Sequence, residues 1–158
     1  MAAQRYHIAD EPLPSDLGRF AVNPQWPMFA QMLAGSWLAI PWFVFNSLAL
    51  GSPTRNRELV LAATSLAGAG ALLLGLDYAT NVGLLTGVWL KIASLSIVVL
   101  KIGVAYALYF SQSRVFEIWR YYGGVARSGL GVVFLGSYFG PQLLKAAVHS
   151  DLLYVILH

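Results

Sequence analysis

The sequence predicts an all-α fold, a polytopic membrane protein in which four transmembrane helices form a bundle. After residue 27 the chain consists almost entirely of four long apolar runs, and about 20 apolar residues are enough to cross a bilayer. Hydrophobic residues make up 58% of the 158 positions and charged residues 11%, which leaves too little polar surface for a soluble globule. All three lysines lie inside the apolar runs, whereas every arginine lies in the N-terminal tail or a connection. A bilayer accounts for this separation of the two cations.

The N-terminal part is expected to divide into a tail and a first span. Residues 1–27 are polar and interrupted by prolines, and residues 28–158 are predicted to form a single transmembrane helical domain. The first span covers residues 28–50 and contains Pro41, which should kink the helix rather than end it. The sequence Gly-Ser-Pro-Thr at residues 51–54 then ends this helix.

The second span covers residues 58–76, just long enough to cross. Small residues recur in it at every fourth position, at Ala63, Ala67, Ala71 and Gly75. Residues four apart lie on the same side of a helix, and small side chains let two helix backbones approach closely. We therefore predict that this small-residue stripe packs against another helix. The alternative is an alanine-rich surface that faces lipid.

The third span covers residues 84–110 and is long enough to tilt in the bilayer. A more polar connector, residues 111–131, follows it. Within the connector one helical face, opposite most of the charges, is formed by Val115, Ile118, Trp119 and Tyr122. This pattern predicts a short amphipathic helix in the membrane interface. The competing interpretation is an extension of the third helix.

The fourth span runs over residues 130–157. Gly136 and Gly140 repeat the small-residue spacing and predict a second close helix contact, and Pro141 should bend or break the helix. The second half is amphipathic and contains Lys145 and Asp151. The run is therefore expected to be either one kinked span or a half-span followed by an interfacial C-terminal helix.

The orientation is predicted from the lysines and arginines outside the spans. The first and third connections carry five arginines between them, the N-terminal tail carries two, and the second connection and the C-terminal end carry none. This count favours both arginine-bearing connections in the cytoplasm and both termini outside. If the first or last run does not cross fully, the sequence also allows a cytoplasmic N-terminus.

Lys101 is the most informative charge in the chain. Lys91, Ser94 and Lys101 lie on one side of the third span. Lys101 is nine residues before Phe110, or about 14 Å along the helix axis, which places it near the middle of the membrane. A lysine there costs on the order of 3 kcal/mol, so we expect another subunit, a lipid phosphate or a hydrated cavity to neutralise it. The alternatives are a side chain that reaches the headgroups or a hydrogen bond to an internal carbonyl.

The other intramembrane charges are expected nearer the outer side of the bilayer. Lys91 has Asp77 or Asp151 as a candidate partner there, and Lys145 lies at a similar depth. The candidate set for an intramembrane charge partner or a pathway is Lys91, Ser94, Lys101, Lys145 and Asp151.

Several classes of chemistry do not fit the sequence. The absence of cysteine removes thiol nucleophiles, disulfides and cysteine-ligated metals. His149 and His158 match no established metal-ligand spacing. There is no phosphate loop, dinucleotide fingerprint or catalytic carboxylate pair, and the scattered basic residues form no patch for nucleic acid. We therefore expect a protein that is not an enzyme and has no catalytic residue, metal, cofactor or nucleic-acid partner.

Two functions remain as hypotheses. The leading one is a small accessory or scaffold subunit of a larger membrane complex, or a homo-oligomer, that acts through helix–helix contacts and has lipids and other subunits as partners. The alternative is a small oligomeric transporter or channel with a lysine-lined path for anions or linked to protons. A membrane enzyme with an unrecognised site is a third option. Arginine-bearing, short connections suit a bacterial inner membrane, and a mitochondrial inner membrane is compatible.

Overall fold

The computed structural model describes residues 16–148 and 151–158, and in these residues the fold is all-helical. A short 3₁₀ helix, η1 (Asp16–Phe20), precedes six α-helices. These are α1 (Gln25–Leu33), α2 (Ser36–Ala49), α3 (Arg55–Asn81), α4 (Gly87–Tyr121), α5 (Leu130–Ala147) and α6 (Asp151–Leu157).

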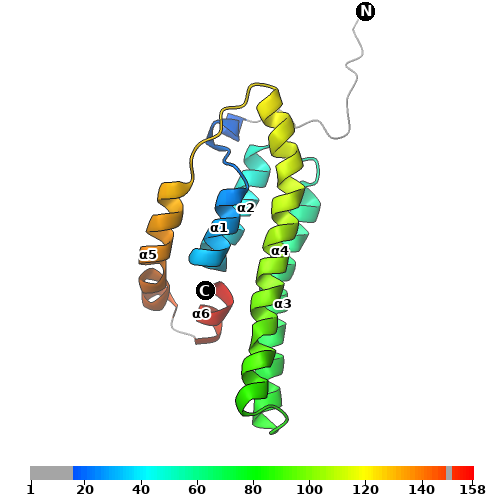
Figure 1. Cartoon of the computed structure of the whole chain (residues 1–158), viewed down its shortest axis with the longest axis vertical. Helices are drawn as coiled ribbons and strands as arrows, with labels where there is room; N and C mark the ends of the chain where they lie inside the picture. The colour runs from blue at the N-terminus through cyan, green and yellow to red at the C-terminus, as the bar shows by residue number, and fades with distance from the viewer. Residues whose placement is uncertain (1–15, 149–150) are drawn as a thin grey trace, which may run out of the picture.

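Two long helices, α3 and α4, form an antiparallel hairpin that runs the length of the molecule (Figure 1). They contain 27 and 35 residues, which corresponds to about 40 and 52 Å at 1.5 Å per residue. Among the described residues, these two helices are long and apolar enough to cross a membrane. Only 17% and 22% of their most apolar stretches are buried inside the protein, whereas the core helix of a soluble protein is mostly buried. Both helices are therefore compatible with membrane insertion.

The main apolar core lies where α2 packs against this hairpin. Its buried side chains come from α2, α3 and α4 and are Ile40, Phe43, Ala62, Val104, Ala105 and Leu108. These residues belong to the half of the hairpin that contains the start of α3 and the end of α4. The other half extends beyond α2 with few neighbours (Figure 1).

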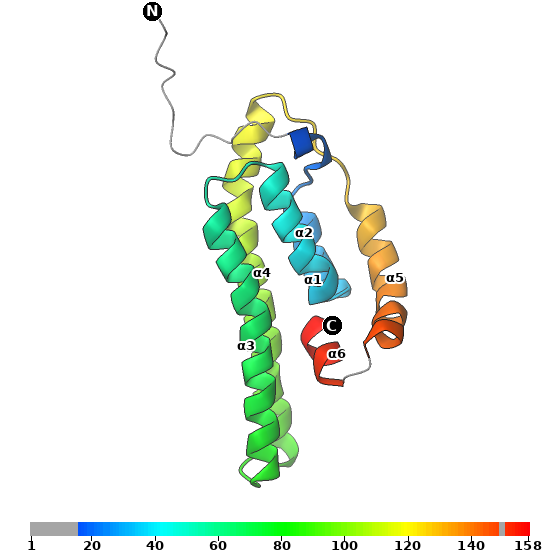
Figure 2. The same ribbon diagram turned by 180° about the vertical axis from the view of Figure 1, so that it is seen from behind.

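The first apolar run is divided into two helices at Gly35. The chain reverses there, so that α1 and α2 form a short helical hairpin (Figures 1 and 2). Gly35 has φ +96° and ψ −176°, a conformation that essentially only glycine adopts. Gln31 Nε2 also donates a 3.1 Å hydrogen bond to Ser36 Oγ across the turn. The glycine therefore reverses the chain, whereas α2 continues through Pro41.

The fourth apolar run is also divided, into α5 and α6. α5 continues through Pro141 to Ala147, and residues 149–150 lie outside the described part of the chain. α6 then returns toward the turn of the α1–α2 hairpin (Figure 2), where the backbone of His158 lies against Gly35. The sequence left two expectations for this run, one kinked span or a half-span followed by an interfacial C-terminal helix. The division into α5 and α6 agrees better with the second of these.

Residues 111–121 continue α4 and do not form a separate interfacial helix. Val115 and Phe116 on this extension are buried against Ala21, Ala49 and Leu50. The start of the connector's apolar face, at Val115, is therefore covered by protein, whereas Tyr122 at its end is 64% exposed. The competing interpretation of this segment is the correct one.

The short α1–α2 hairpin and the long α3–α4 hairpin bring the arginine-bearing segments together at one end of the molecule, here called the arginine end. η1, the first turn of α3, the end of α4 and the α4–α5 connection all lie there (Figure 1). They contain Arg19, Arg55, Arg57, Arg114, Arg120 and Arg127. At the opposite end, the α3–α4 turn at residues 82–86 carries neither lysine nor arginine.

Gly35→Ala should destabilise the α1–α2 hairpin, because alanine is strained at this φ and its Cβ would overlap the backbone of His158. We expect the free energy of unfolding to fall by about 1–3 kcal/mol. The matched control is Gly131→Ala in α5, where a Cβ meets no atom within 4 Å, and it should leave stability unchanged or raise it. Thermal unfolding in detergent compares the two variants. Equal midpoints would show that this turn does not require glycine.

Candidate functional site

A buried carboxylate, Glu58, is the centre of a polar network at the arginine end. The side chain is 2% exposed. Its Oε1 accepts hydrogen bonds from Ser52 Oγ at 2.7 Å, Thr54 Oγ1 at 2.6 Å and Ser111 Oγ at 3.0 Å. A carboxylate bonded in this way is stabilised by neutral donors, since no ion pair occurs among the described residues within 4 Å.

Gln112 connects this carboxylate to the rest of the helices. It is fully buried, and its Nε2 donates to Glu58 Oε2 at 3.0 Å and to the carbonyl of Phe43 at 2.8 Å. Its Oε1 accepts a 3.1 Å hydrogen bond from Asn46 Nδ2, and Asn46 Oδ1 accepts one of 3.0 Å from the backbone N–H of Val22. The network therefore joins α2, α3 and α4 to the segment that follows η1.

Sequence reasoning did not find this network. It placed Glu58 at the end of a span without a role, and it singled out neither Asn46 nor Gln112. The available signals were an amide inside the first apolar run and another just beyond the third run, because a polar group in such a run needs a buried partner. Asn46 and Gln112 are 66 residues apart, and spacing alone does not pair them.

Lys101 is buried in the middle of α4, with 7% of its surface exposed. Its Nζ donates a 2.8 Å hydrogen bond to the backbone carbonyl of Val155 in α6. This bond to an internal carbonyl is one of the alternatives that the sequence left open. It ties the short C-terminal helix to the long hairpin.

An open cavity of about 960 Å³ lies beside Lys101, between the extended half of the α3–α4 hairpin and the ends of α1 and α6. The predicted residues Lys91, Ser94 and Lys101 all line it. Lys91 and Ser94 are exposed, and Ser94 Oγ donates to the carbonyl of Lys91 at 2.7 Å. The cavity is lined mainly by apolar side chains, and its other polar residues are Gln31, Asp77, Thr80, Tyr154 and His158. Three of the five candidate residues therefore line the same cavity.

Gln31, which lines this cavity, has a side-chain oxygen without a hydrogen-bond partner. Its side chain is 7% exposed, and its Nε2 is bonded to Ser36. Its Oε1 is buried without a hydrogen-bond partner. An unpartnered buried oxygen is unfavourable, and it lies on the same cavity as the Lys101 side chain.

Of the other two candidate residues, Lys145 is not part of the cavity lining. Lys145 is exposed on α5, with its Nζ 5.9 Å from the centroid of the Tyr154 ring. Asp151 is the first residue of α6, and its side chain lies outside the described part of the structure. His149 also lies outside it, and the ring of His158 stacks on Tyr154. In the part of the chain that is described, no group of three or more histidine, aspartate or glutamate side chains is placed to hold a metal ion.

The small-residue stripe of α3 is exposed along its whole length. Ala63, Ala67, Ala71 and Gly75 are all exposed, and a Cβ on Gly75 would meet no atom within 4 Å. The buried positions of α3 are instead Glu58, Ala62, Ser65 and Ala69, which lie on the opposite side of the helix. The stripe therefore has no partner among the described residues.

Gly136 and Gly140 are used inside the chain. Both are buried in α5, where a Cβ on Gly136 would overlap Leu38 and one on Gly140 would overlap the Trp37 ring. These glycines thus make room for two large side chains of α2, whereas the helix whose backbone lies close to α5 is α1. Both partners are parts of the same polypeptide.

Comparison with known protein families, with curated proteins and with solved structures finds no match to this chain. Its function has to be argued from its own residues. The features that carry chemistry are the buried network at the arginine end, the lysine-lined cavity and the unpartnered stripe.

Gln112→Leu should unfold the protein more easily, because it leaves Glu58 Oε2, Asn46 Nδ2 and the Phe43 carbonyl without their partner. Each buried unsatisfied group costs about 1–3 kcal/mol, so we expect a loss of roughly 3 kcal/mol or more in the free energy of unfolding. The control is Gln142→Leu, the same replacement at an exposed position of α5, where little change is expected. Denaturant unfolding in detergent measures both. A loss for Gln112→Leu no larger than for Gln142→Leu would contradict the role of the network.

Proposed function

We propose that this chain is an integral membrane protein in which α3 and α4 cross the bilayer and the α1–α2 and α5–α6 hairpins enter it from the arginine end. The length, apolar composition and low burial of α3 and α4 support the two crossings. The expected bundle of four crossing helices has less support, because the first and fourth runs are each divided into shorter helices.

The arginine end is proposed to face the cytoplasm. Arginines in short segments beside membrane helices favour the cytoplasmic side, and six of them gather at this end while the α3–α4 turn carries no cation. The described N-terminal segment then lies on the cytoplasmic side, which is the alternative orientation that the sequence allowed. A bacterial inner membrane remains the proposed location, with a mitochondrial inner membrane as the other candidate.

The function that the geometry supports best is that of an accessory or scaffold subunit, which binds other membrane helices or a second copy of itself. One observation carries it: the small-residue stripe is exposed, on the side of α3 opposite its buried residues Glu58, Ala62, Ser65 and Ala69. Small side chains promote helix contacts in lipid because they let backbones approach closely. Gly136 and Gly140 are covered within the chain by side chains of α2, which leaves the exposed stripe on α3 as the small-residue surface for a partner helix.

Gly75→Leu should weaken association in the membrane, because a bulky side chain separates helices that meet along the stripe. Gly103→Leu is the matched control. Gly103 lies in the same hairpin, its Cβ position is equally open, and it is not part of the stripe. We expect about a tenfold weaker association for Gly75→Leu, which corresponds to about 1.4 kcal/mol, and no change for Gly103→Leu.

The measurement is co-purification and cross-linking after mild detergent extraction. The natural chain has no cysteine, so a single cysteine introduced at Ala67 would report contacts of the stripe alone. A strictly monomeric wild type without any partner would overturn the proposal. Equal weakening by the two glycine variants would show that the stripe is not the contact surface.

A transporter or channel is the second candidate, and the lysine-lined cavity is the observation that favours it. The cavity joins Lys91, Ser94 and Lys101 in the part of the hairpin expected to lie within the membrane. A cation in such a low-dielectric hollow attracts anions strongly. In this case several copies would have to complete a continuous path.

Lys101→Leu should reduce anion flux through liposomes that contain the protein, because it removes the buried cation. Hydrogen bonds to a charged group are worth about 1.5–3 kcal/mol, so the flux should fall roughly tenfold or more. Lys101→Arg should retain most of the flux, and Lys145→Leu, outside the cavity lining, should not change it. Absence of flux in the wild type, or an equal loss in Lys145→Leu, would reject this candidate.

A further inference from the structure

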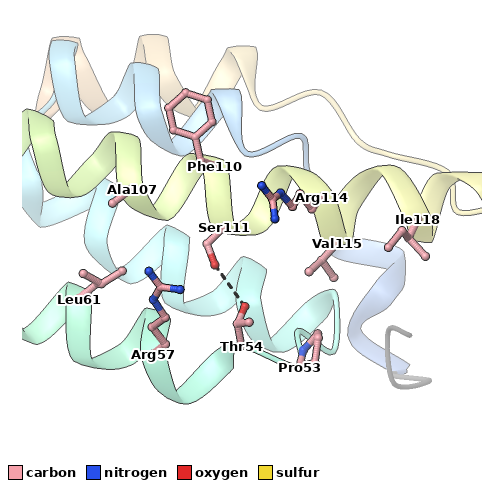
Figure 3. Close-up of a pocket in the computed structure, with 10 residues that line it drawn as sticks. All are labelled: Pro53, Thr54, Arg57, Leu61, Ala107, Phe110, Ser111, Arg114, Val115 and Ile118. Atoms are coloured by element: carbon pink, nitrogen blue, oxygen red, sulfur yellow. Dashed lines mark hydrogen bonds between the residues drawn. The ribbon is translucent and has the colours of Figure 1, made fainter. Parts of the chain in front are cut away.

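A second pocket, of about 440 Å³, lies at the arginine end between the start of α3 and the second half of α4 (Figure 3). Arg57 from α3 and Arg114 from α4 line it, and both side chains are exposed. Figure 3 shows their guanidinium groups on the two sides of Ser111. Among the described residues neither guanidinium has a hydrogen-bond or ion-pair partner. Two like charges that share a pocket are most favourable when an anion lies between them.

The base of the pocket is polar but offers no free carboxylate. Thr54 and Ser111 line it, with their hydroxyl oxygens 3.2 Å apart. Both hydroxyls donate to Glu58 Oε1, at 2.6 and 3.0 Å. All the oxygens of Glu58 are thus engaged in the buried network, and the two arginines are the groups left to bind a ligand. Together they carry one positive charge more than this carboxylate neutralises.

The remaining wall is apolar and lies on both sides of the arginines, with Pro53, Val115 and Ile118 toward the arginine end. Leu61 follows Arg57 by one turn along α3, and Phe110 and Ala107 precede Arg114 by one and two turns along α4. Because the two helices are antiparallel, these three apolar side chains lie toward the middle of the hairpin. The arginines therefore lie between two apolar parts of the wall, and the part formed by Leu61, Ala107 and Phe110 extends toward the proposed membrane interior.

We propose that this pocket binds a phosphate group, and that an anionic phospholipid carries it. Guanidinium groups bind phosphate through paired, charge-assisted hydrogen bonds, and Arg57 and Arg114 approach the pocket from two helices. The acyl chains of a lipid held there would lie against Leu61, Ala107 and Phe110. The ligand would also join α3 to α4 at the end where the buried network already fixes them. This inference is separate from the helix-contact function and does not depend on it.

The experiment compares lipid binding by the wild type and three arginine variants. The full-length protein is placed in nanodiscs of phosphatidylcholine with or without about one-fifth phosphatidylglycerol, and native mass spectrometry counts the lipids that remain bound. Arg57→Gln and Arg114→Gln should each weaken retention of phosphatidylglycerol roughly tenfold, as expected for the loss of a charge-assisted hydrogen bond. Arg55→Gln is the matched control. It removes the same charge from an exposed position of the same helix turn that does not line the pocket, and it should retain the lipid.

A parallel arm titrates the detergent-solubilised protein with inorganic phosphate. Binding of phosphate alone that is lost in Arg57→Gln and Arg114→Gln but kept in Arg55→Gln would support the phosphate site and identify free phosphate as its source. The proposal is overturned if neither lipid nor phosphate binds, or if all three variants weaken binding equally, since that would reflect the overall charge of this end. Neither Arg57 nor Arg114 has a structural partner, so the variants should fold, and circular dichroism checks this.

Discussion

The burial of one carboxylate, Glu58, constrains the rest of the structure. A charge removed from water needs several hydrogen-bond donors in fixed positions. Here the donors come from the α2–α3 connection and from α4. One of them, Gln112, is also hydrogen-bonded to Asn46 and to the backbone of α2. In the observed arrangement of α2, α3 and α4 both carboxylate oxygens of Glu58 and the side-chain amides of Gln112 and Asn46 are hydrogen-bonded. The network therefore fixes the register of the long hairpin at one end, and the apolar core around Phe43 and Leu108 packs within the frame it sets.

The molecule consequently has two parts, which differ in whether their side chains find contacts within the chain. At the arginine end, polar bonds and apolar packing within the chain complete the structure, and the small residues Gly136 and Gly140 are used for internal contacts. The extended half of the α3–α4 hairpin has few neighbours and exposes apolar side chains on most of its surface, which is favourable in lipid or against another helix and unfavourable in water. The lysine-lined cavity lies at the boundary between the two parts, where α6 ends and Lys101 binds its backbone carbonyl.

Much of the helical content could be predicted because apolar runs and helical spacing are local properties. The second and third runs correspond to α3 and α4, and the same-side placement of Lys91, Ser94 and Lys101 follows from periodicity alone. The reversal at Gly35 was missed because the apolar run of 23 residues has the length of a crossing. The only change of direction expected in it was a kink at Pro41. A proline near the start of a helix loses few hydrogen bonds, whereas the conformation of Gly35 depends on the contacts that α1 and α2 make after the chain has turned.

By itself, the sequence determined the apolar segments, the separation of lysines from arginines and the spacing of small residues, because each depends on neighbours within a few turns of helix, and from these it predicted a membrane environment. The tertiary structure alone decided which runs fold back, that six arginines gather at one end, and that the stripe of α3 is left exposed while the glycines of α5 are buried. It also decided that Glu58 would be buried, since its partner Gln112 is 54 positions away in the sequence, and Gln112 is bonded in turn to Asn46, 66 positions from it. Such contacts depend on how whole helices pack, and no local pattern encodes them.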